Sequence, residues 1–578
     1  MTRQHWKRNM ALLAAGLLIA GACGGGDDDD GEAGGDTGES TEGTGAGSAI
    51  DELGGTIFVG PQEEEDAEPV SGGSISVGVE SETNSFAPGF FQGSQAGFNV
   101  AYAVYDPLVI RNADGELEPY LAESIEPNDD FTEWTLTLRP DVQFHDGTPL
   151  NAEAMKTMFD DFLTAEGTNT ASSLERDVEG VEVVDELTLK YNLAQPNAAW
   201  PDVLTGQVGW PFSPTAAAQL GEDFGSQPVG TGPFSFVSWQ RDGQFVVERN
   251  PDYWQEGLPY LDEVTFRPIP DEDTRATSLS SGDIDAVQSV RLSSFLSSVV
   301  DIPTVEIAMG LGNGAGNMMF NVEAPPVDDV RIRQALAYAI DQQALIEVVA
   351  GEAAIATEPR TQYFWSEDPF YSEEVAEAWP TFDPERAQEL YDEYVNDPNR
   401  SDGKAVGEPV SFSYQCTNIP SLVEQATALQ GMWEEIGFQV DINPLEQSVL
   451  INSAVTGDYQ STCFRAGSEN DPLTTWQNSF GDPEVYIANL SNYTSPLLEE
   501  TLQTLRTTDD LATRQAAVEE FSLELAEQLP VVWTGSDLTF IAYREGVQGV
   551  AGWTLPDGSL GDGVAPGITL WSQVWVEE

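Results

Sequence analysis

The chain has 578 residues and a formal net charge of −75 at pH 7, with 98 acidic and 23 basic side chains. This length exceeds what a single hydrophobic core usually supports, so at least two lobes are expected. So negative a chain would repel nucleic acid and anionic lipid headgroups, which excludes functions that need a basic binding surface. The acidity predicts a well-solvated surface, which adaptation to salt would also favour, and an acidic ligand site is the alternative.

The first 22 residues, 1–22, have the pattern of a lipoprotein signal peptide. A basic start with Arg3, Lys7 and Arg8 is followed by an apolar run over residues 11–19 and by small residues before Cys23. The apolar run is shorter than the roughly 20 residues that a membrane-spanning helix needs. We therefore expect cleavage before Cys23 and attachment of lipid to it, which anchors the chain to the cell membrane on the extracytoplasmic side. The alternative is an ordinary cleaved signal with an incidental cysteine.

Residues 23–71 are rich in Gly, Asp, Glu, Thr and Ser and contain few apolar residues. Such a segment cannot bury enough surface to offset the entropy lost on ordering, so it is expected to be a disordered, acidic tether. As a flexible coil it would span roughly 40 Å, and repulsion between its acidic runs would lengthen it. That reach would let an anchored domain find a partner in the membrane.

The first lobe is expected to begin near residue 72, with a strand over residues 74–79. Further along, Asn151 follows a turn and is placed to cap a helix over residues 152–163. Its side chain can accept a hydrogen bond from one of the free amides at the helix start. Strands and helices are therefore expected to mix in this lobe.

Residues 230–233, Gly-Thr-Gly-Pro, predict a tight backbone corner in which the glycines are free to take positive φ and the proline sets the exit direction. Two strands should follow, over residues 234–239 and 245–248, because both runs contain β-branched and aromatic residues. Asp242-Gly243 between them is a strong hairpin signal, and Pro251 ends the ladder.

The second lobe opens near residue 317 with a clear helical period after a candidate cap at Asp328. Its apolar residues form one stripe: Ile332, Ala335, Leu336, Ala339 and Ile340. Such a stripe belongs to a core. A second helix is expected to start after Asp341 and to stop at Gly351.

Residues 410–464 alternate between strand-like and helix-like runs. Strands are expected over residues 410–415, 438–442 and 459–464, with helices over 422–436 and 448–455 between them. Right-handed crossovers would make a parallel sheet, whose ligands bind beyond the carboxyl ends of the strands. In a 2-1-3 order, Cys416 and Cys463 would lie on neighbouring strands and either form a disulfide or remain two buried thiols.

Several sequence motifs occur in a fixed order along the chain. Between residues 227 and 285 they are GTGPF, RNPDYW, LDEVTFRPIPD, a Thr-Arg pair and GDID. FHDGTP precedes them at residues 144–149, and DDVRIRQALAYAID follows at residues 328–341. This order resembles the extracytoplasmic solute-binding proteins of the oligopeptide, dipeptide and nickel type, family 5, which supply ABC importers. The resemblance covers roughly residues 72–578.

The resemblance implies an α/β fold with two lobes, periplasmic-binding-protein-like, of type II and cluster C. Lobe I would comprise residues 72–311, with an extra subdomain inserted at about residues 110–220, and lobe II residues 312–535. Residues 536–578 would return to lobe I. Closure of the lobes around a solute would hinge at the crossings near Leu311 and Ser536.

The resemblance also implies a role for Asp471, which follows the third strand of the parallel sheet. In peptide-binding members an aspartate in an Asp-Pro element pairs with the α-amino group of the ligand, a strong charge-assisted contact. Capping of a helix that starts at Pro472 is an equal alternative. Trp476 would either line the pocket or belong to the core.

Three further residues are candidates for contact with the ligand. Arg465 stands where members of the family often carry tryptophan, a change that would enlarge the pocket or meet an anionic group. Trp365 and Phe86 lie in loop-like stretches, residues 361–365 and 84–91, that the family places beside the cleft.

The sequence offers no machinery for an enzyme. His5 in the signal and His145 in a turn are the two histidines, and no GxSxG motif accompanies them. Cys416 and Cys463 are the cysteines that remain after Cys23, so a zinc cluster is not expected. No local pattern selects a pair of glycosidase carboxylates. We expect no enzyme activity, no cofactor and no metal site, and keep an extracytoplasmic hydrolase as a remote hypothesis.

The sequence therefore predicts a monomeric, lipid-anchored substrate-binding protein of an ABC importer that captures an oligopeptide-like solute by closure of two lobes. Its partners would be the permease and ATPase subunits of that importer, with the membrane bound through the lipid and no nucleic acid. A non-peptide solute such as a sugar, an opine or a metal complex is one alternative. A surface sensor or receptor that binds a solute without transport is another.

Overall fold

The computed structural model describes most of the chain after residue 55. The described residues are 56–60, 62, 68–91, 94–164, 177–289, 295–351, 354, 359–366, 368–467, 471–483, 488–564 and 569–577. The predicted signal peptide, Cys23 and most of the predicted tether lie outside them. Residues 45–578 form one compact unit. In the part of the chain that is described, no helix is long and apolar enough to cross a membrane.

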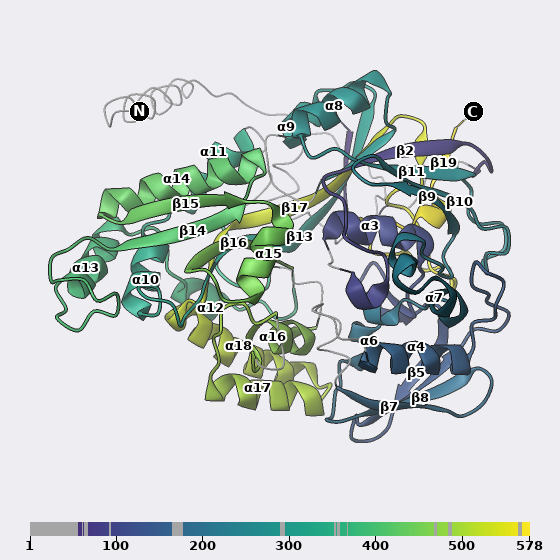
Figure 1. Ribbon diagram of the computed structural model, residues 1–578, viewed down its shortest axis with the longest axis horizontal. Coiled ribbons are helices and arrows are strands. Elements are labelled where there is room, and N and C mark those ends of the chain that lie inside the picture. The colour runs from purple at the N-terminus through teal and green to yellow at the C-terminus, as the bar shows by residue number, and fades with distance from the viewer. Residues whose placement is uncertain are drawn as a thin grey trace, which may run out of the picture. The chain divides into compact units, whose positions relative to one another are not determined.

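A mixed sheet of eleven strands organises this unit (Figure 1). The strand order is β15-β14-β16-β13-β17-β12-β2-β11-β10-β9, and β1 pairs with β13. The long strands β13 (Val305–Phe320) and β17 (Val531–Arg544) lie at its centre and pair antiparallel. They join a first half of the sheet, β12 to β9, to a second half, β15 to β16.

The first half of the sheet is built on β2. Its strands are β2 (Ser74–Val79), β12 (Ala286–Ser289), β11 (Glu263–Pro268), β10 (Gln244–Arg249) and β9 (Phe234–Gln240). β2 pairs in parallel with both β11 and β12. The predicted strand over residues 74–79 and the predicted hairpin are confirmed, since β9 and β10 pair antiparallel around Asp242, whose φ is 56°.

The Gly-Thr-Gly-Pro corner does not use the conformational freedom that the sequence offers. Neither Gly230 nor Gly232 has a positive φ. Instead the chain passes so close to Val104 that a Cβ atom on Gly230 would stand 2.3 Å from the Val104 carbonyl oxygen. Glycine is therefore needed for close approach. His145 holds the corner, because its Nδ1 accepts from the Gly230 N–H at 3.3 Å and its Nε2 donates to the Gly232 carbonyl at 2.9 Å.

A separate antiparallel sheet precedes this corner in the chain. Its strands, in the order β5-β6-β8-β7, are β5 (Ala122–Pro127), β6 (Glu133–Leu138), β8 (Thr188–Leu193) and β7 (Val178–Val183). Helix α4 (Ala152–Thr164) packs on it, with the rings of Phe159 and Tyr191 4.9 Å apart. Asn151 caps α4 as predicted, because its Oδ1 accepts from the Ala154 N–H at 2.9 Å.

The second half of the sheet confirms the predicted 2-1-3 order. Its parallel strands, in the order β15-β14-β16, are β15 (Gln439–Leu445), β14 (Ser411–Thr417) and β16 (Ser461–Gly467). Helices α14 (Pro420–Ile436) and α15 (Gln447–Val455) connect them. Both helices lie close to the predicted ranges.

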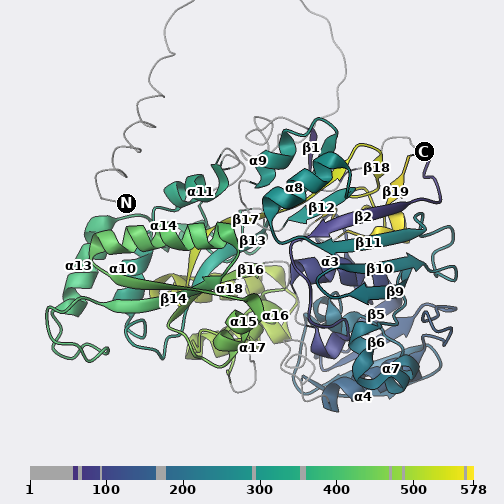
Figure 2. The same ribbon diagram turned by 45° about the horizontal axis from the view of Figure 1, so that its top comes forward.

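The two connecting helices cover opposite faces of this half (Figures 1 and 2). Trp433 of α14 packs against Tyr414, whereas Ser453 of α15 donates to the side chain of the next residue, Gln415. Successive residues of a strand point to opposite faces, so these contacts place the helices on different sides. A disulfide joins Cys416 of β14 to Cys463 of β16, with their Cα atoms 5.0 Å apart.

Helix α10 (Val330–Tyr338) carries the first three residues of the predicted apolar stripe, and Ala339 and Ile340 follow its end. All five residues of the stripe are buried. The cap of α10 is Asp329, which accepts from the Arg331 N–H, and not the predicted Asp328. Asp328 accepts from the Ser401 hydroxyl instead. Helix α11 (Gln342–Ala350) starts after Asp341 and ends at Gly351, as predicted.

The remaining elements are mostly short. On the side of the sheet where α15 lies, Figure 1 shows α12 (Glu373–Ala378), α16 (Pro472–Phe480), α17 (Pro496–Thr507) and α18 (Leu511–Gln528). The others are η2 (Pro88–Phe90), α3 (Gln95–Val104), β3 (Val109–Arg111), β4 (Leu117–Pro119), α6 (Trp200–Val203), η3 (Gln207–Gly209), α7 (Pro214–Leu220), η4 (Gly221–Ser226), α8 (Glu272–Ser281), α9 (Phe295–Val300), α13 (Pro384–Val395), β18 (Val547–Gln548), η6 (Trp571–Gln573) and β19 (Trp575–Val576).

The prediction of a disordered tether is wrong for residues 56–59. They form strand β1 (Thr56–Val59), which pairs in parallel with β13, Ile57 lying opposite Ile307. Ile57 and Val59 pack against the buried cluster formed by α8, α9, β12 and the start of β13. The physical reason is local, because Thr-Ile-Phe-Val is a β-branched and aromatic run within an acidic segment.

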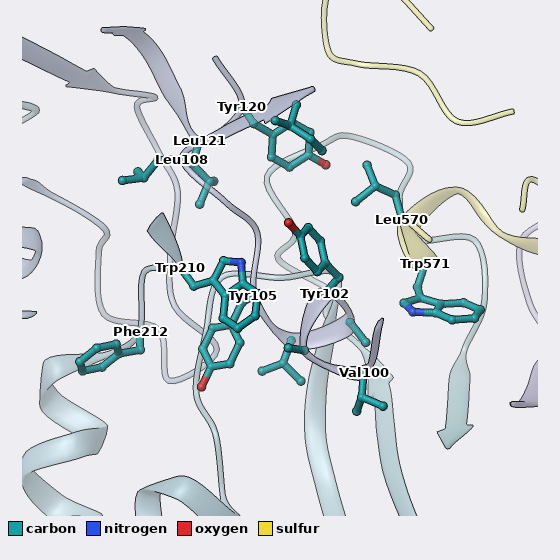
Figure 3. Close-up of a cluster of buried hydrophobic side chains, with 14 of the residues drawn as sticks. Val100, Tyr102, Tyr105, Leu108, Tyr120, Leu121, Trp210, Phe212, Leu570 and Trp571 are labelled. Carbon is teal, nitrogen blue, oxygen red and sulfur yellow. The ribbon is translucent and has the colours of Figure 1, made fainter. Parts of the chain in front are cut away.

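The carboxyl-terminal segment packs into the core of the first half (Figure 3). In this cluster the rings of Tyr105 and Trp210 are stacked with their centroids 5.7 Å apart. Leu570 and Trp571 reach the same cluster from the end of the chain, and the Trp571 Nε1 donates to the Asn99 carbonyl at 2.8 Å. A second buried cluster fills the second half of the sheet and includes Tyr414 and Cys416 of β14 and Cys463 of β16.

The free energy of unfolding should depend on pH because His145 is buried against the Gly-Thr-Gly-Pro corner. Burial lowers the pKa of His145 from its ordinary value of 6.5 to about 4. Since the unfolded chain takes up this proton first, acidification from pH 6.5 to 4 favours unfolding. His145 should contribute at most about 3 kcal/mol to the loss of unfolding free energy over this range. Urea unfolding of wild type and His145→Gln would check this, and an unchanged pH slope in the variant would contradict it.

Candidate ligand-binding site

The candidate site lies where the parallel strands β14, β15 and β16 end. Ligands of open parallel sheets bind beyond the carboxyl ends of the strands, where the strand order reverses. In this half, β14 lies between β15 and β16, so the reversal falls at these strands. Asp471 follows β16 and stands at the start of α16.

Asp471 caps α16 and pairs with an arginine. Its Oδ1 accepts from the Leu473 N–H at 2.8 Å, which confirms the capping alternative. Both of its carboxylate oxygens also accept from Arg514 Nη2 of α18, each at 2.5 Å. The carboxylate that was predicted to meet a ligand ammonium therefore already has a charged partner, and that predicted role stays a prediction.

A second ion pair, from segments that pack in the core of the first half, contacts Asp471. Asp202 of α6 pairs with Arg111 at the end of β3, and its Oδ2 accepts from the backbone N–H of Asp471 at 3.0 Å. The Asp202 side chain is fully buried. Burial raises the pKa of Asp202, and the nearby charge of Arg111 opposes this shift. Asp202 thus pairs with Arg111 and also accepts the backbone hydrogen bond that joins α6 to the start of α16.

Two more contacts join the halves beside this pair. Gln477 of α16 donates to the Asp177 carboxylate at 2.6 Å and accepts from Arg506 of α17 at 2.5 Å. The Arg506 carbonyl in turn accepts from the Ala198 N–H at 3.0 Å. The start of α16 and the end of α17 are therefore held against the segments that flank the antiparallel sheet of the first half.

Two further carboxyl groups interact electrostatically with Arg111. Burial raises the pKa of Asp368 to about 6, with the charges of Arg360 and Arg111 acting in the opposite direction. Burial also raises the pKa of Asp562 well above its ordinary value, again opposed by Arg111. These carboxyl groups come from distant parts of the chain, and the charge of Arg111 acts on the pKa of each of them.

The structure separates the predicted site residues into two groups. Trp365 is half-buried, and its carbonyl accepts from the Asp368 N–H at 2.9 Å, so its loop lies next to one of the carboxyl groups that interact with Arg111. Trp476 is fully buried between Phe364 and Phe521, with ring centroids 5.6 Å and 4.9 Å away. The core alternative is the one observed for Trp476.

Phe86 and Arg465 lie apart from these residues. Phe86 is buried in the core of the first half, its ring 4.6 Å from that of Phe245 and 5.0 Å from that of Trp239. It packs in this core, and a role as a pocket wall has no support from its contacts. Arg465 lies on β16 opposite Gly316 of β13 and is partly exposed.

Sequence reasoning missed the ion pairs. Arg111 and Asp202 are 91 residues apart, and Asp471 and Arg514 are 43 apart, so neither pair forms a local motif. The available signal was the scarcity of basic residues, 23 against 98 acidic ones, which makes each arginine a candidate partner for a buried carboxylate.

A groove of about 740 Å³ lies elsewhere, at the amino ends of β14 and β15. Phe412, Phe438 and Val440 line it together with polar residues such as Asp441 and Gln460. It is at the opposite end of these strands from Asp471 and does not belong to the site. Within the described residues, no cluster of three His, Cys, Asp or Glu side chains could hold a metal ion.

Residues 116–487, more than half of the chain, match the family described as bacterial extracellular solute-binding proteins, family 5. The chain belongs to this family. Members are substrate-binding components that work outside the cytoplasm, and the two halves with their parallel strands fit that architecture. The predicted family and fold class are thus confirmed.

Similar proteins bind different solutes. The chain is 33% identical over 298 residues to the glutathione-binding protein GsiB of Salmonella typhi, a match that covers 51% of this chain and 56% of that protein. The chain therefore spans about half the length of that curated relative. Two solved structures share the fold, each with a TM-score of 0.76 over 88% of this chain. They are AgaA of A. tumefacien R10 with agropinic acid (24% identical, 99% of that chain) and AppA of Bacillus subtilis with a nonapeptide (19% identical, 100% of that chain).

Removal of the Asp202 charge should destabilise this family 5 protein. In Asp202→Asn the free energy of unfolding should fall by about 3 kcal/mol, because Arg111 loses its partner at a buried site. Asp262→Asn is the matched control, since Asp262 pairs with Arg249 at 2.8 Å but its side chain is 64% exposed. That change should cost much less. Urea unfolding checks both, and equal losses would contradict the importance of the buried pair.

Proposed function

We propose that the chain is the substrate-binding component of an ABC importer, which captures an oligopeptide-like solute outside the membrane and delivers it to the permease. The observation that carries this proposal is the family match over residues 116–487. It is supported by the arrangement in which side chains of both halves meet at Asp202 and Asp471, beside the ends of the parallel strands.

The proposed mechanism is closure of two lobes. Lobe I comprises residues 72–311 with a subdomain at about residues 110–220, lobe II residues 312–535, and residues 536–578 return to lobe I. The hinge lies near Leu311 and Ser536, where β13 and β17 cross between the lobes. A shift of the β13–β17 register between Gly310 and Gly314 supports this, because an irregular ladder bends more easily than a regular one. The solute must bind the closed state more tightly than the open one.

An oligopeptide-like solute is favoured because the names of two similar proteins specify peptides. GsiB is a glutathione-binding protein, and AppA was solved with a nonapeptide. AgaA was solved with agropinic acid, which favours a non-peptide solute as the second candidate. A surface sensor with the same fold would bind its solute without a permease.

The location and partners follow from the sequence. A signal peptide over residues 1–22, lipid on Cys23 and the acidic segment after it would anchor the protein outside the cell membrane, close to the permease. The ATPase subunits of the importer complete the set of partners, and the protein acts as a monomer without enzyme activity or cofactor.

Asp471 is proposed to contribute to recognition of the ligand amino group. Its carboxylate has two oxygens and about four acceptor positions, so it can keep Arg514 and still accept from an ammonium. Arg465 and Trp365 are proposed to contact other parts of the solute.

Calorimetric titration of the full chain tests these proposals. Tetra-alanine with a free amino terminus, its N-acetylated form and glutathione would be the probes. Wild type should bind the free peptide, and Asp471→Ala should weaken it by about tenfold or more while affecting the acetylated peptide much less. Asp510→Ala is the matched control, because Asp510 caps α18 in the same way through the Thr513 N–H.

Each result has a distinct meaning. Equal losses for the free and acetylated peptides would remove Asp471 from recognition of the amino group. Failure of wild type to bind the peptides and glutathione would remove the oligopeptide assignment.

A further inference from the structure

Two buried asparagines lie four residues apart, Asn317 on the central strand β13 and Asn321 one residue after the end of that strand. Asn317 is 2% exposed and Asn321 is 6% exposed. Asn321 is fully hydrogen-bonded. Its Nδ2 donates to the carbonyls of Gly457 and Tyr459 at 3.1 Å and 3.3 Å, and its Oδ1 accepts from the Glu323 N–H at 3.2 Å and from Asn492 at 3.0 Å.

Asn317 is different, because neither its Oδ1 nor its Nδ2 has a hydrogen-bond partner within the described chain. Burial of an amide without partners is unfavourable, and native proteins rarely leave both atoms of one side chain in this condition. A leucine of similar volume would suit a purely structural position better. The exception therefore needs an explanation at this position.

The position of Asn317 supplies one. Across the sheet, Asn317 lies opposite Phe464 of β16 on one side and Trp533 of β17 on the other. The β14–β16 register pairs Gln415 with Thr462, and its continuation by two residues brings Thr417 beside Phe464. Asn317 thus lies in one row with Thr417, the last residue of β14, where the parallel strands end.

The same row contains two other buried polar groups. The Thr417 hydroxyl and the Trp533 indole N–H also have no hydrogen-bond partner in the described part of the chain. Thr417, Asn317 and Trp533 come from three different strands. Three unsatisfied polar groups in one row are therefore a property of this place in the sheet and not of one misplaced side chain.

We propose that Asn317 is a solute-contacting residue, whose carboxamide donates to and accepts from an amide group of the bound solute, with the Thr417 hydroxyl as a second contact. A peptide group offers one acceptor and one donor, which are the two partners that Asn317 lacks. The inference rests on the proposed function and assigns a residue and a chemical class to its site. The solute reaches Asn317 when the lobes separate, and closure then buries both.

The test is Asn317→Leu in the full chain, with tetra-alanine and glutathione as probes. The affinity of the better probe should fall by about tenfold, as expected for two lost hydrogen bonds. The midpoint of thermal unfolding without added solute should stay the same or rise, because an unsatisfied buried amide has been removed.

Asn321→Leu is the matched control, since it changes the same type of side chain, also buried, one residue after the end of β13. It should lower the unfolding midpoint and leave the affinity within about threefold. Thr417→Val, which replaces a hydroxyl by a methyl group, should weaken binding in the same direction by a smaller factor without loss of stability. This second variant keeps the proposal testable even where leucine at position 317 disturbs the strand.

Unchanged affinity in both Asn317→Leu and Thr417→Val would overturn the proposal while leaving the proposed function in place. A fall in the unfolding midpoint of Asn317→Leu like that of Asn321→Leu, with affinity retained in Thr417→Val, would also overturn it and make Asn317 structural. Failure of wild type to bind either probe would overturn the proposed peptide function together with this inference.

Discussion

The antiparallel pairing of β13 with β17 joins the two halves of the central sheet. The start of β13 is buried with α8 and α9, and its end belongs to the core of the second half, so one strand runs through both. Backbone hydrogen bonds hold the pair along most of its length, and the ladder is irregular between Gly310 and Gly314. Asn317 follows three residues later. A solute bound there would act directly on the strand that joins the halves.

The contact between the halves is electrostatic in a chain that is otherwise strongly acidic. Arg111 pairs with Asp202 and Arg514 pairs with Asp471, so the two guanidiniums balance the two carboxylates. Asp202 also accepts a hydrogen bond from the Asp471 backbone N–H. It therefore takes part in an ion pair with Arg111 and in the hydrogen bond that crosses between the halves. Burial makes these contacts more sensitive to the loss of one partner than the many exposed carboxylates elsewhere.

The parts of this structure that the sequence predicted are those with local causes. β2, the β9–β10 hairpin, the Asn151 cap and the 2-1-3 strand order follow from periodicity, turn residues and the handedness of crossovers. Asp328 and Asp329 are adjacent candidates for one cap, and Ser401, distant in sequence, decides between them. Likewise, the close approach of Val104 requires glycine at position 230, and Val104 is distant in sequence. The pairing of Asp202 with Arg111 arises only when segments distant in sequence come together, so no local sequence pattern predicts it. The same holds for the lack of hydrogen-bond partners at the Asn317 side chain within the described residues.

Native mass spectrometry of the full chain purified from its own host tests the central claim most directly, because it asks which solute the protein holds in the cell. The account predicts a family of co-purified masses that unfolding releases and that tandem spectrometry resolves into short peptides. A single co-purified compound without a peptide bond would contradict the oligopeptide assignment and would identify the solute itself.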